Sequence, residues 1–238
     1  MSDDLSVSGI DPTTVDFEQL YSGAALAPGI GLEKPPWDIG RPQPLLTALE
    51  RAGRITGDVL DVGCGPGDTA IHLAELGYRV TGLDIAPTAI EQARTRAAGR
   101  DLTLTFAVAD ATTIPGFDNH FDTVVSSALL HCLSPTQRRS HIAALARVTK
   151  PGGRLIQFSF AATKHAQLYA PYPLSEPELR SEFTTPDWDI TTLRPEFIEA
   201  VNPPKEIRTM FASKGFHPDL DETGGLRLPV HLLEAQRV

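Results

Sequence analysis

Short β-rich runs alternate with helical runs along residues 58–148, and this order leaves few folds open to the chain. The helical runs carry apolar residues at helical spacing and begin at a capping residue or a proline. Strands are expected at 58–62, 79–83, 102–108 and 121–125, and helices at 68–76, 87–98 and 135–148. Because such alternation forms right-handed βαβ units, we predict a doubly wound α/β fold with a mostly parallel sheet.

The segment after residue 148 predicts further strands but leaves their arrangement open. Pro151, Gly152 and Gly153 are expected to break the chain before a fifth strand at 154–160. One arrangement completes a seven-stranded sheet with a helix at 175–183, a strand at 188–198 interrupted at Pro195, a helix at 204–213 and a strand at 229–236. The other makes 207–216 the last core helix and 165–202 a lid insertion.

The first 44 residues are polar and then rich in proline, which denies them a long helix or a central strand. We therefore expect residues 1–44 to form an N-terminal arm that covers the active site. Residues 45–238 are expected to form a single domain with lid elements toward its C-terminus.

Charge and cysteine content exclude several kinds of partner. Lys plus Arg number 21 against 30 for Asp plus Glu, so a net charge of −9 disfavours nucleic acid and anionic lipid. The N-terminus shows neither a basic nor an apolar leader, and Cys64 and Cys132 form no CxxC motif. We expect a cytoplasmic monomer or homodimer that binds neither nucleic acid nor a membrane.

A glycine-rich turn follows the first strand, in the run Val59 to Asp68. Glycines at 63, 65 and 67 allow positive φ angles and a close approach of the backbone to a ligand, and the helix that follows presents free N–H groups. A dinucleotide site would have GxGxxG, whereas this spacing is GxGxG with Asp68 in place of the third small residue. The turn therefore favours a ligand without pyrophosphate.

Acidic residues lie at three strand ends that meet at one edge of the predicted sheet: Asp61, Asp84 and Asp110. The turns beside them carry no Lys or Arg, which is a poor arrangement for phosphate. Three carboxylates suit a cationic, hydroxyl-rich ligand that lacks phosphates, and S-adenosylmethionine is such a ligand. Structural interpretations stay open for Asp84 as a cap of the helix at Pro87, and for Asp110 as a solvated loop residue.

Over about residues 45–160, the chain resembles class I S-adenosylmethionine-dependent methyltransferases, which have the three acids and GxGxG in this order. The resemblance implies that Asp61 positions the methionine ammonium group, Asp84 holds the ribose and Asp110 faces the adenine amino group. Further cofactor contacts are implied for the loop, for residues beside the adenine ring and for the end of the fourth strand: Gly63, Cys64, Gly65, Ile85, Ala111 and Ser126. S-adenosylhomocysteine would be the product.

The residues after the fourth strand indicate a small acceptor molecule. This segment, Val125 to His131, carries no Asn/Asp-Pro-Pro-aromatic motif for nucleobases and no strand-end acid for Mg²⁺. Because the seven histidines form no HxH or HExxH pattern, we expect a metal-independent reaction. His131 is the candidate general base for a hydroxyl or ring N–H acceptor, and a structural role in the turn 129–133 is the alternative.

The run Trp37-Asp-Ile-Gly-Arg41-Pro-Gln-Pro in the arm resembles a narrower bacterial group related to thiopurine methyltransferases, which includes heterocyclic toxin methyltransferases. By this resemblance, Trp37 would cover the methionine end of the cofactor and Arg41 would pair with its carboxylate. Trp37 could instead be an apolar anchor for the arm. Aromatic residues of the arm and the C-terminal half are candidate acceptor contacts beside His131, with plain packing as the alternative: Phe17, Tyr21, Phe160, Tyr169 and Tyr172.

The leading hypothesis is methyl transfer to oxygen or nitrogen of a small aromatic heterocycle, quinolone-like or phenolic. A quinone-biosynthesis C-methyltransferase would use the same cofactor site on a different acceptor. An NAD-dependent oxidoreductase is disfavoured by Asp68, and a cofactor-binding module without catalysis is disfavoured by the arm and the aromatic residues.

Overall fold

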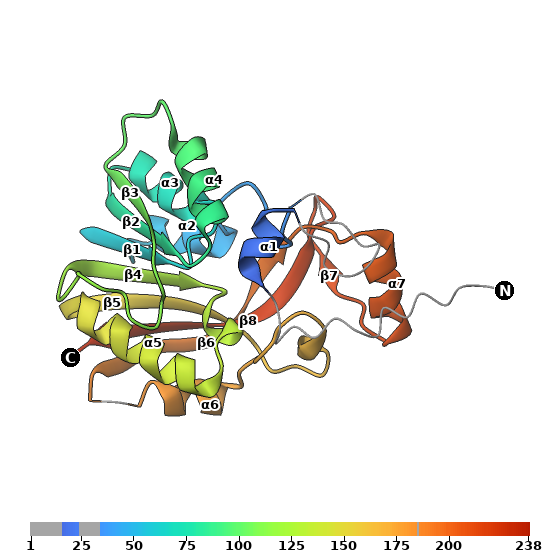
Figure 1. Ribbon diagram of the computed structural model, residues 1–238. Helices are drawn as coiled ribbons and strands as arrows, with labels where there is room; N and C mark the ends of the chain where they lie inside the picture. Colours follow the sequence, from blue (N-terminus) through green and yellow to red (C-terminus); the bar gives the residue numbers. More distant parts are fainter. Residues whose placement is uncertain (1–15, 24–33, 185) are drawn as a thin grey trace.

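The computed structural model describes residues 16–23, 34–184 and 186–238, and it has one mixed sheet with helices on both faces (Figure 1). The strand order is β3-β2-β1-β4-β5-β8-β6, and β7 pairs with β8. The strands are β1 (Asp58–Val62), β2 (Arg79–Asp84), β3 (Leu104–Val108), β4 (Phe121–Ser127), β5 (Thr149–Phe160), β6 (Trp188–Ala200), β7 (Asp219–Leu220) and β8 (Leu226–Arg237). The predicted doubly wound α/β fold is confirmed.

Apolar side chains of the strands form one cluster on each face of the sheet. The helices α2 (Pro44–Arg51), α3 (Asp68–Glu75) and α4 (Pro87–Ala97) cover one face, and α5 (Pro135–Val148) and α6 (Glu176–Glu182) cover the other. Strands β1 to β5 are parallel, with Val62 beside Leu83 and Leu83 beside Ala107. The carboxyl ends of β1, β2 and β3 therefore meet at one edge.

The first of the two C-terminal arrangements is the one that forms. Strands β6 and β8 pair antiparallel over their whole length, and α7 (Lys205–Ser213) and β7 lie where this hairpin extends past the parallel strands (Figure 1). The predicted interruption at Pro195 is wrong, because β6 runs through it. Proline lacks the N–H of a ladder bond but is tolerated here, since β6 is an edge strand.

The predicted break at 151–153 is also wrong, because β5 already begins at Thr149. Phe121 of β4 pairs with Thr149, and Thr123 pairs with Arg154, so a step of two residues on β4 matches a step of five on β5. The proline and the glycines therefore form a bulge within the strand instead of a turn before it.

The described parts of the arm are a short helix, α1 (Phe17–Tyr21), and an irregular run that enters α2 at Pro44. Residues 1–15 and 24–33 of the predicted arm lie outside the described residues. Within the described part of the chain, no helix has the length and apolar character needed to cross a membrane.

Candidate functional site

The glycine-rich turn joins β1 to α3 at the carboxyl edge of the sheet. The amides of Gly63 and Cys64 both donate to the carbonyl of Leu83, at 2.7 and 2.9 Å, which holds the turn against the end of β2. Gly65 has a φ of +51°, and a Cβ there would lie 2.8 Å from the hydroxyl of Tyr21. Both the backbone angle and the space left by Tyr21 therefore favour glycine at this position.

Asp61 lies in β1 under this turn and is 2% exposed. Its Oδ2 atom is buried and has no hydrogen-bond partner among the described residues. Burial, and then the nearby charge of Asp84, raises the pKa of Asp61 to about 7. A cationic group placed against this carboxylate would supply the missing partner and favour its charged form.

Asp84, at the end of β2, connects the glycine turn to the start of α4. Its Oδ2 accepts from the amide of Gly65 and its Oδ1 from the amide of Ala86, each at 2.9 Å. Burial raises its pKa, against these backbone hydrogen bonds, which lower it. Asp84 does not cap α4, because the N-cap residue is Ala86. Its carboxylate instead orders the turn before the helix, and its contact with a ribose stays a prediction.

The predicted adenine contacts lie on the next strand end. Asp110 is exposed, and its Oδ1 accepts from the amide and the hydroxyl of Thr112, both at 2.7 Å. The carbonyl of Ala111 accepts from Nδ1 of the buried His141 at 2.8 Å. Burial lowers the pKa of His141 to about 4, so a neutral imidazole anchors this turn at pH 7.

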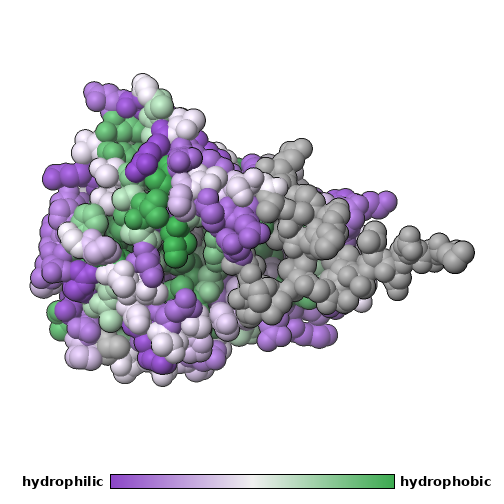
Figure 2. Space-filling view, in the orientation of Figure 1, coloured by the Kyte–Doolittle hydropathy of each residue, from purple (hydrophilic) through white to green (hydrophobic). Residues whose placement is uncertain are grey.

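Two apolar side chains at these strand ends face solvent: Ile85 is 59% exposed and Val108 is 51% exposed. In Figure 2 an apolar strip crosses the middle of the face on which β3 and α5 lie. Solvent-exposed large apolar side chains that flank two acids are suited to a flat ring. Ile85 was expected here, whereas Val108 was missed, although its position directly before Ala109-Asp110 was a signal.

The arm packs on the glycine turn. Trp37 Nε1 donates to the hydroxyl of Tyr21 at 2.7 Å, and the rings of Phe17 and Tyr21 lie 5.9 and 6.1 Å from that of Trp37. The structure thus places Tyr21 beside Gly65, with Trp37 and Phe17 packed behind it. Arg41 forms an ion pair with Glu199 of β6 at 2.6 Å, so a cofactor contact of Arg41 would require it to leave this partner.

An ion triad that the sequence analysis missed fixes the arm. Arg96 of α4 contacts Asp38 of the arm at 2.7 Å and Asp68, the first residue of α3, at 3.0 Å. Asp38 is 4% exposed. Farther along the arm, Gln43 exchanges two side-chain hydrogen bonds with the backbone of Glu199, at 2.8 and 2.9 Å. The arm thus connects the glycine turn to β6.

A second group lies beyond the ends of β4 and β5. His131 is in a short helical turn, η2 (Leu130–Cys132), and its ring lies 4.3 Å from that of Phe160, which lies 5.1 Å from Tyr169. The amide of Tyr172 donates to the carbonyl of His131 at 2.9 Å. The side chains of His131, Phe160 and Tyr169 therefore come together, and the backbone of Tyr172 joins them.

His131 is 3% exposed, and its Nδ1 has no hydrogen-bond partner within the described chain. Burial, and then the charge of Arg138, lowers the pKa of His131 to about 3. The imidazole is therefore neutral at pH 7. Ser126, near the end of β4, is fully buried, and its Oγ likewise lacks a partner in the described residues.

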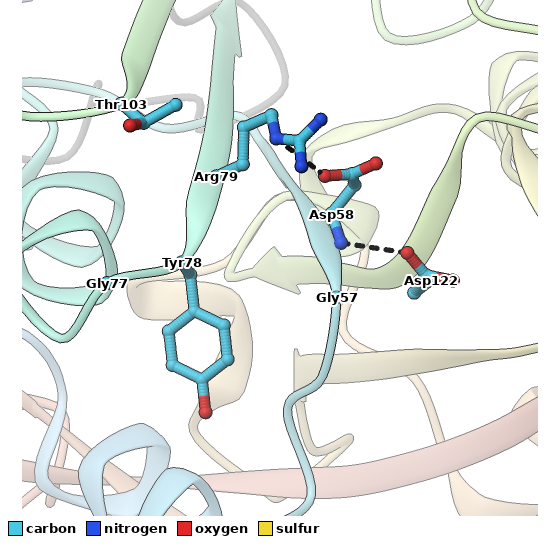
Figure 3. Close-up of a pocket in the computed structure, with 7 residues that line it drawn as sticks. All are labelled: Gly57, Asp58, Gly77, Tyr78, Arg79, Thr103 and Asp122. Carbon is cyan, nitrogen blue, oxygen red and sulfur yellow. Dashed lines mark hydrogen bonds and ion pairs between the residues drawn. The ribbon is translucent and has the colours of Figure 1, made fainter.

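A hollow also lies at the opposite edge of the sheet, between the starts of β1 and β2 (Figure 3). Its charged side chains are paired: Arg79 binds Asp58 at 3.1 Å, and Asp122 binds Lys150, which lies outside the lining, at 2.7 Å. None of the predicted site residues lines this hollow. Across the described ranges, no three His, Cys, Asp or Glu side chains are grouped so that they could hold a metal ion.

A methyltransferase domain model matches residues 59–153. The 2-heptyl-1-hydroxyquinolin-4(1H)-one methyltransferase of Mycobacteroides abscessus is 41% identical over 181 residues, 75% of this chain and 78% of the relative. The demethylmenaquinone methyltransferase of Thermus thermophilus is 30% identical over 174 residues, 71% of this chain and 77% of the relative.

Solved structures show the same similarity. A protein studied for the conversion of a disulfide bond into a thioacetal group during echinomycin biosynthesis aligns with a TM-score of 0.76 and 35% identity, over 93% of this chain and 91% of that one. The 1,6-didemethyltoxoflavin-N1-methyltransferase of Burkholderia thailandensis shares the fold, with a TM-score of 0.58 and 19% identity over 82% of this chain and 77% of that one.

Proposed function

Because the chain belongs to the S-adenosylmethionine-dependent methyltransferases of small molecules, we propose that it methylates oxygen or nitrogen of a quinolone-like or phenolic heterocycle. The observation that carries this acceptor class is the contact series of His131, Phe160 and Tyr169 beyond the ends of β4 and β5. Flat rings at this place suit a flat acceptor and exclude water. The hydroxyquinolone acted on by the relative from Mycobacteroides abscessus belongs to the same chemical class.

The residues at the strand ends fit S-adenosylmethionine, which supplies a methyl group activated by the sulfonium charge. The unpartnered Oδ2 of Asp61 would receive the ammonium group, and Gly63, Cys64 and Gly65 would lie along the methionine part. The carboxylate of Asp84 would hold the ribose. The adenine ring would lie between Ile85, Val108 and Ala111, with Asp110 at its amino group. Ser126 would border the site from the end of β4.

Tyr21 belongs to this cofactor group in our proposal. Trp37 donates its N–H to the Tyr21 oxygen, so the hydroxyl proton of Tyr21 stays available for an acceptor atom near Gly65. Phe17 and Trp37 would exclude water from the same side. Arg41 would serve the cofactor carboxylate only after release from Glu199.

The protein's part in the reaction is alignment, exclusion of water and removal of a proton. The neutral His131 can accept a hydrogen bond from a hydroxylated acceptor and take its proton during transfer. We propose that no metal ion is needed, because the sulfonium already activates the methyl group. A chelator should leave the initial rate of methylation unchanged, and a metal requirement would contradict this.

Calorimetry tests the cofactor site. S-adenosylhomocysteine should bind and NADH should not, and Asp84→Ala should abolish S-adenosylhomocysteine binding because it removes the carboxylate that holds Gly65 and the ribose. Asp118→Ala, at a 72% exposed side chain, is the control and should bind as the wild type does. Wild-type affinity in Asp84→Ala would refute the ribose assignment.

The acceptor is identified by a screen with labelled methyl donor on 1-hydroxyquinolin-4-ones, phenols, thiols and a demethylmenaquinone analogue. We expect the label on oxygen or nitrogen of the heterocycle. The 30% identity to a demethylmenaquinone methyltransferase favours carbon methylation as the second candidate, which label on a quinone ring carbon would establish. We further propose that the enzyme acts as a monomer or homodimer in the cytoplasm, testable by light scattering and fractionation.

A further inference from the structure

A polar patch lies on the sheet face that α5 and α6 cover. It consists of Ser126, Gln157, Ser159 and His231, which share this face with the apolar Leu155 and Leu233. In the strand register, Ser126 pairs with Gln157 and Ser159 pairs with His231, and Gln157 and Ser159 are two residues apart on β5. The four side chains therefore form a continuous row across β4, β5 and β8.

Each member of the row has a buried atom without a partner among the described residues: Ser126 Oγ, Gln157 Oε1, Ser159 Oγ and His231 Nδ1. The serines and Gln157 are 0% exposed, and the two amide hydrogen bonds of Gln157 go to the carbonyls of Ser126 and Phe158. Leaving one buried polar atom unpaired costs roughly 1–3 kcal/mol. Buried water commonly satisfies such groups in proteins.

The turn η2, which holds His131, packs on β5, and α5, which covers the same face as the row, contributes the buried Arg138. Arg138 is 5% exposed, its Nη1 lies 3.4 Å from Glu182 of α6, and its Nε is buried without a partner in the described structure. Its charge acts on His131, whose Nδ1 is also unpartnered. At the other end, His231 is partly exposed and lies near Glu176. The charged groups of α5 and α6 that act on this region are thus Arg138, Glu176, Glu178 and Glu182.

We propose that Ser126, Gln157, Ser159 and His231, bridged by buried water, carry the acceptor's proton from His131 to solvent. The proposal rests on the function proposed above. As the methyl carbon leaves sulfur and bonds to the acceptor oxygen, the O–H proton passes to His131 and then through the row to His231 and bulk water. S-adenosylhomocysteine leaves as a neutral thioether, so the positive charge of the sulfonium departs as this proton.

An exit is needed because His131 cannot keep the proton. Its surroundings are apolar and its nearest named charge is the cation of Arg138, so a charged imidazole there is strongly disfavoured. At the other end of the row, burial also lowers the pKa of His231, although Glu176 raises it in part. His231 is partly exposed, so a proton that reaches it can pass to water. The row therefore runs from a histidine that is closed off from solvent to one that solvent can reach.

The test uses Ser159→Ala and His231→Gln with a 1-hydroxyquinolin-4-one at pH values one unit below and above the acceptor's own pKa. Below it, where the acceptor carries its proton, both variants should lower kcat about tenfold. Above it, where the acceptor is an anion, kcat should stay within about twofold of wild type. His72→Gln is the matched control, because His72 also has a buried, unpartnered ring nitrogen but belongs to α3 on the opposite face.

A crystal structure at high resolution gives a readout independent of activity, and it should show ordered water between Arg138 Nε, Gln157 Oε1, Ser159 Oγ and His231 Nδ1. A dry row would overturn the proposal. So would an equal loss of kcat at both pH values, or no loss at either. A wild-type enzyme that binds S-adenosylhomocysteine but methylates no hydroxylated heterocycle would refute the proposed acceptor class and this proton path with it.

Discussion

Asp61 is the residue whose charge state should control cofactor affinity. Burial and Asp84 raise its pKa to about 7, whereas an ammonium group needs it ionised. Below pH 7, binding must therefore first remove a proton from Asp61. We expect the Kd of S-adenosylhomocysteine to rise about tenfold for each pH unit below 7 and to level off above it, as measured by calorimetry in several buffers.

Asp61→Asn tests the cause, because asparagine keeps the size of the side chain but cannot ionise. The variant should bind more weakly at pH 8 and show little change in Kd between pH 5 and 8. Asp118→Asn is the control: this side chain is 72% exposed and lies outside the proposed cofactor site, so the variant should bind as the wild type does at each pH. A wild-type Kd that is constant across this range would contradict the role of Asp61.

The sequence was sufficient to bring the three acids to one edge, because parallel strands end together and each acid follows a recognisable strand. It could not reveal that Asp38, Arg96 and Asp68 form one triad. These residues belong to the arm, α4 and α3, and their contact depends on how the arm docks. Nor could the sequence reveal that Tyr21 lies over Gly65, because this position is set by the packing of α1 on α4.

At the scale of elements, the arm should depend on Arg96 for its attachment. Arg96→Leu would leave the carboxylate of Asp38 buried without its cation and free the first turn of α3. We expect a loss of about 2 kcal/mol in the free energy of unfolding, since the guanidinium is one-third exposed and a fully buried pair would cost more. Urea denaturation measures this, and calorimetry should show weaker S-adenosylhomocysteine binding.

Arg100→Leu is a matched control on the same segment, because Arg100 pairs with Glu75 where both side chains are about half exposed. It should change stability by less than about 0.5 kcal/mol and leave cofactor affinity unchanged. If Arg96→Leu behaves like this control, the triad does not hold the arm.

The elements themselves were largely predictable, and the errors share a physical cause. The strand β6 was expected to break at Pro195, and β5 was expected to start only after Gly153. Proline and glycine do disfavour a strand, but the position of each segment in the sheet determines whether the strand ends there. An edge strand needs no N–H on its outer side, and a bulge accommodates extra residues. The residues of either segment do not determine its place in the strand order.

For the molecule as a whole, two buried histidines and Asp61 have opposite effects on how the free energy of unfolding changes with pH. Burial lowers the pKa values of His131 and His141 to about 3 and about 4, from 6.5. The free energy of unfolding is unaffected by these histidines above pH 6.5, where both stay neutral in the folded and unfolded states. It falls by about 1.4 kcal/mol per histidine for each pH unit from 6.5 down to 4. The raised pKa of Asp61 acts in the other direction, stabilising the protein most below pH 4 and least above pH 7.

His141→Asn isolates one of these contributions, because an asparagine amide can still donate to the Ala111 carbonyl but does not titrate. Between pH 6.5 and 4.5, urea denaturation should show the free energy of unfolding of the wild type falling relative to the variant by about 1.4 kcal/mol per pH unit. Parallel pH curves for the two proteins would mean that His141 titrates normally in the folded state.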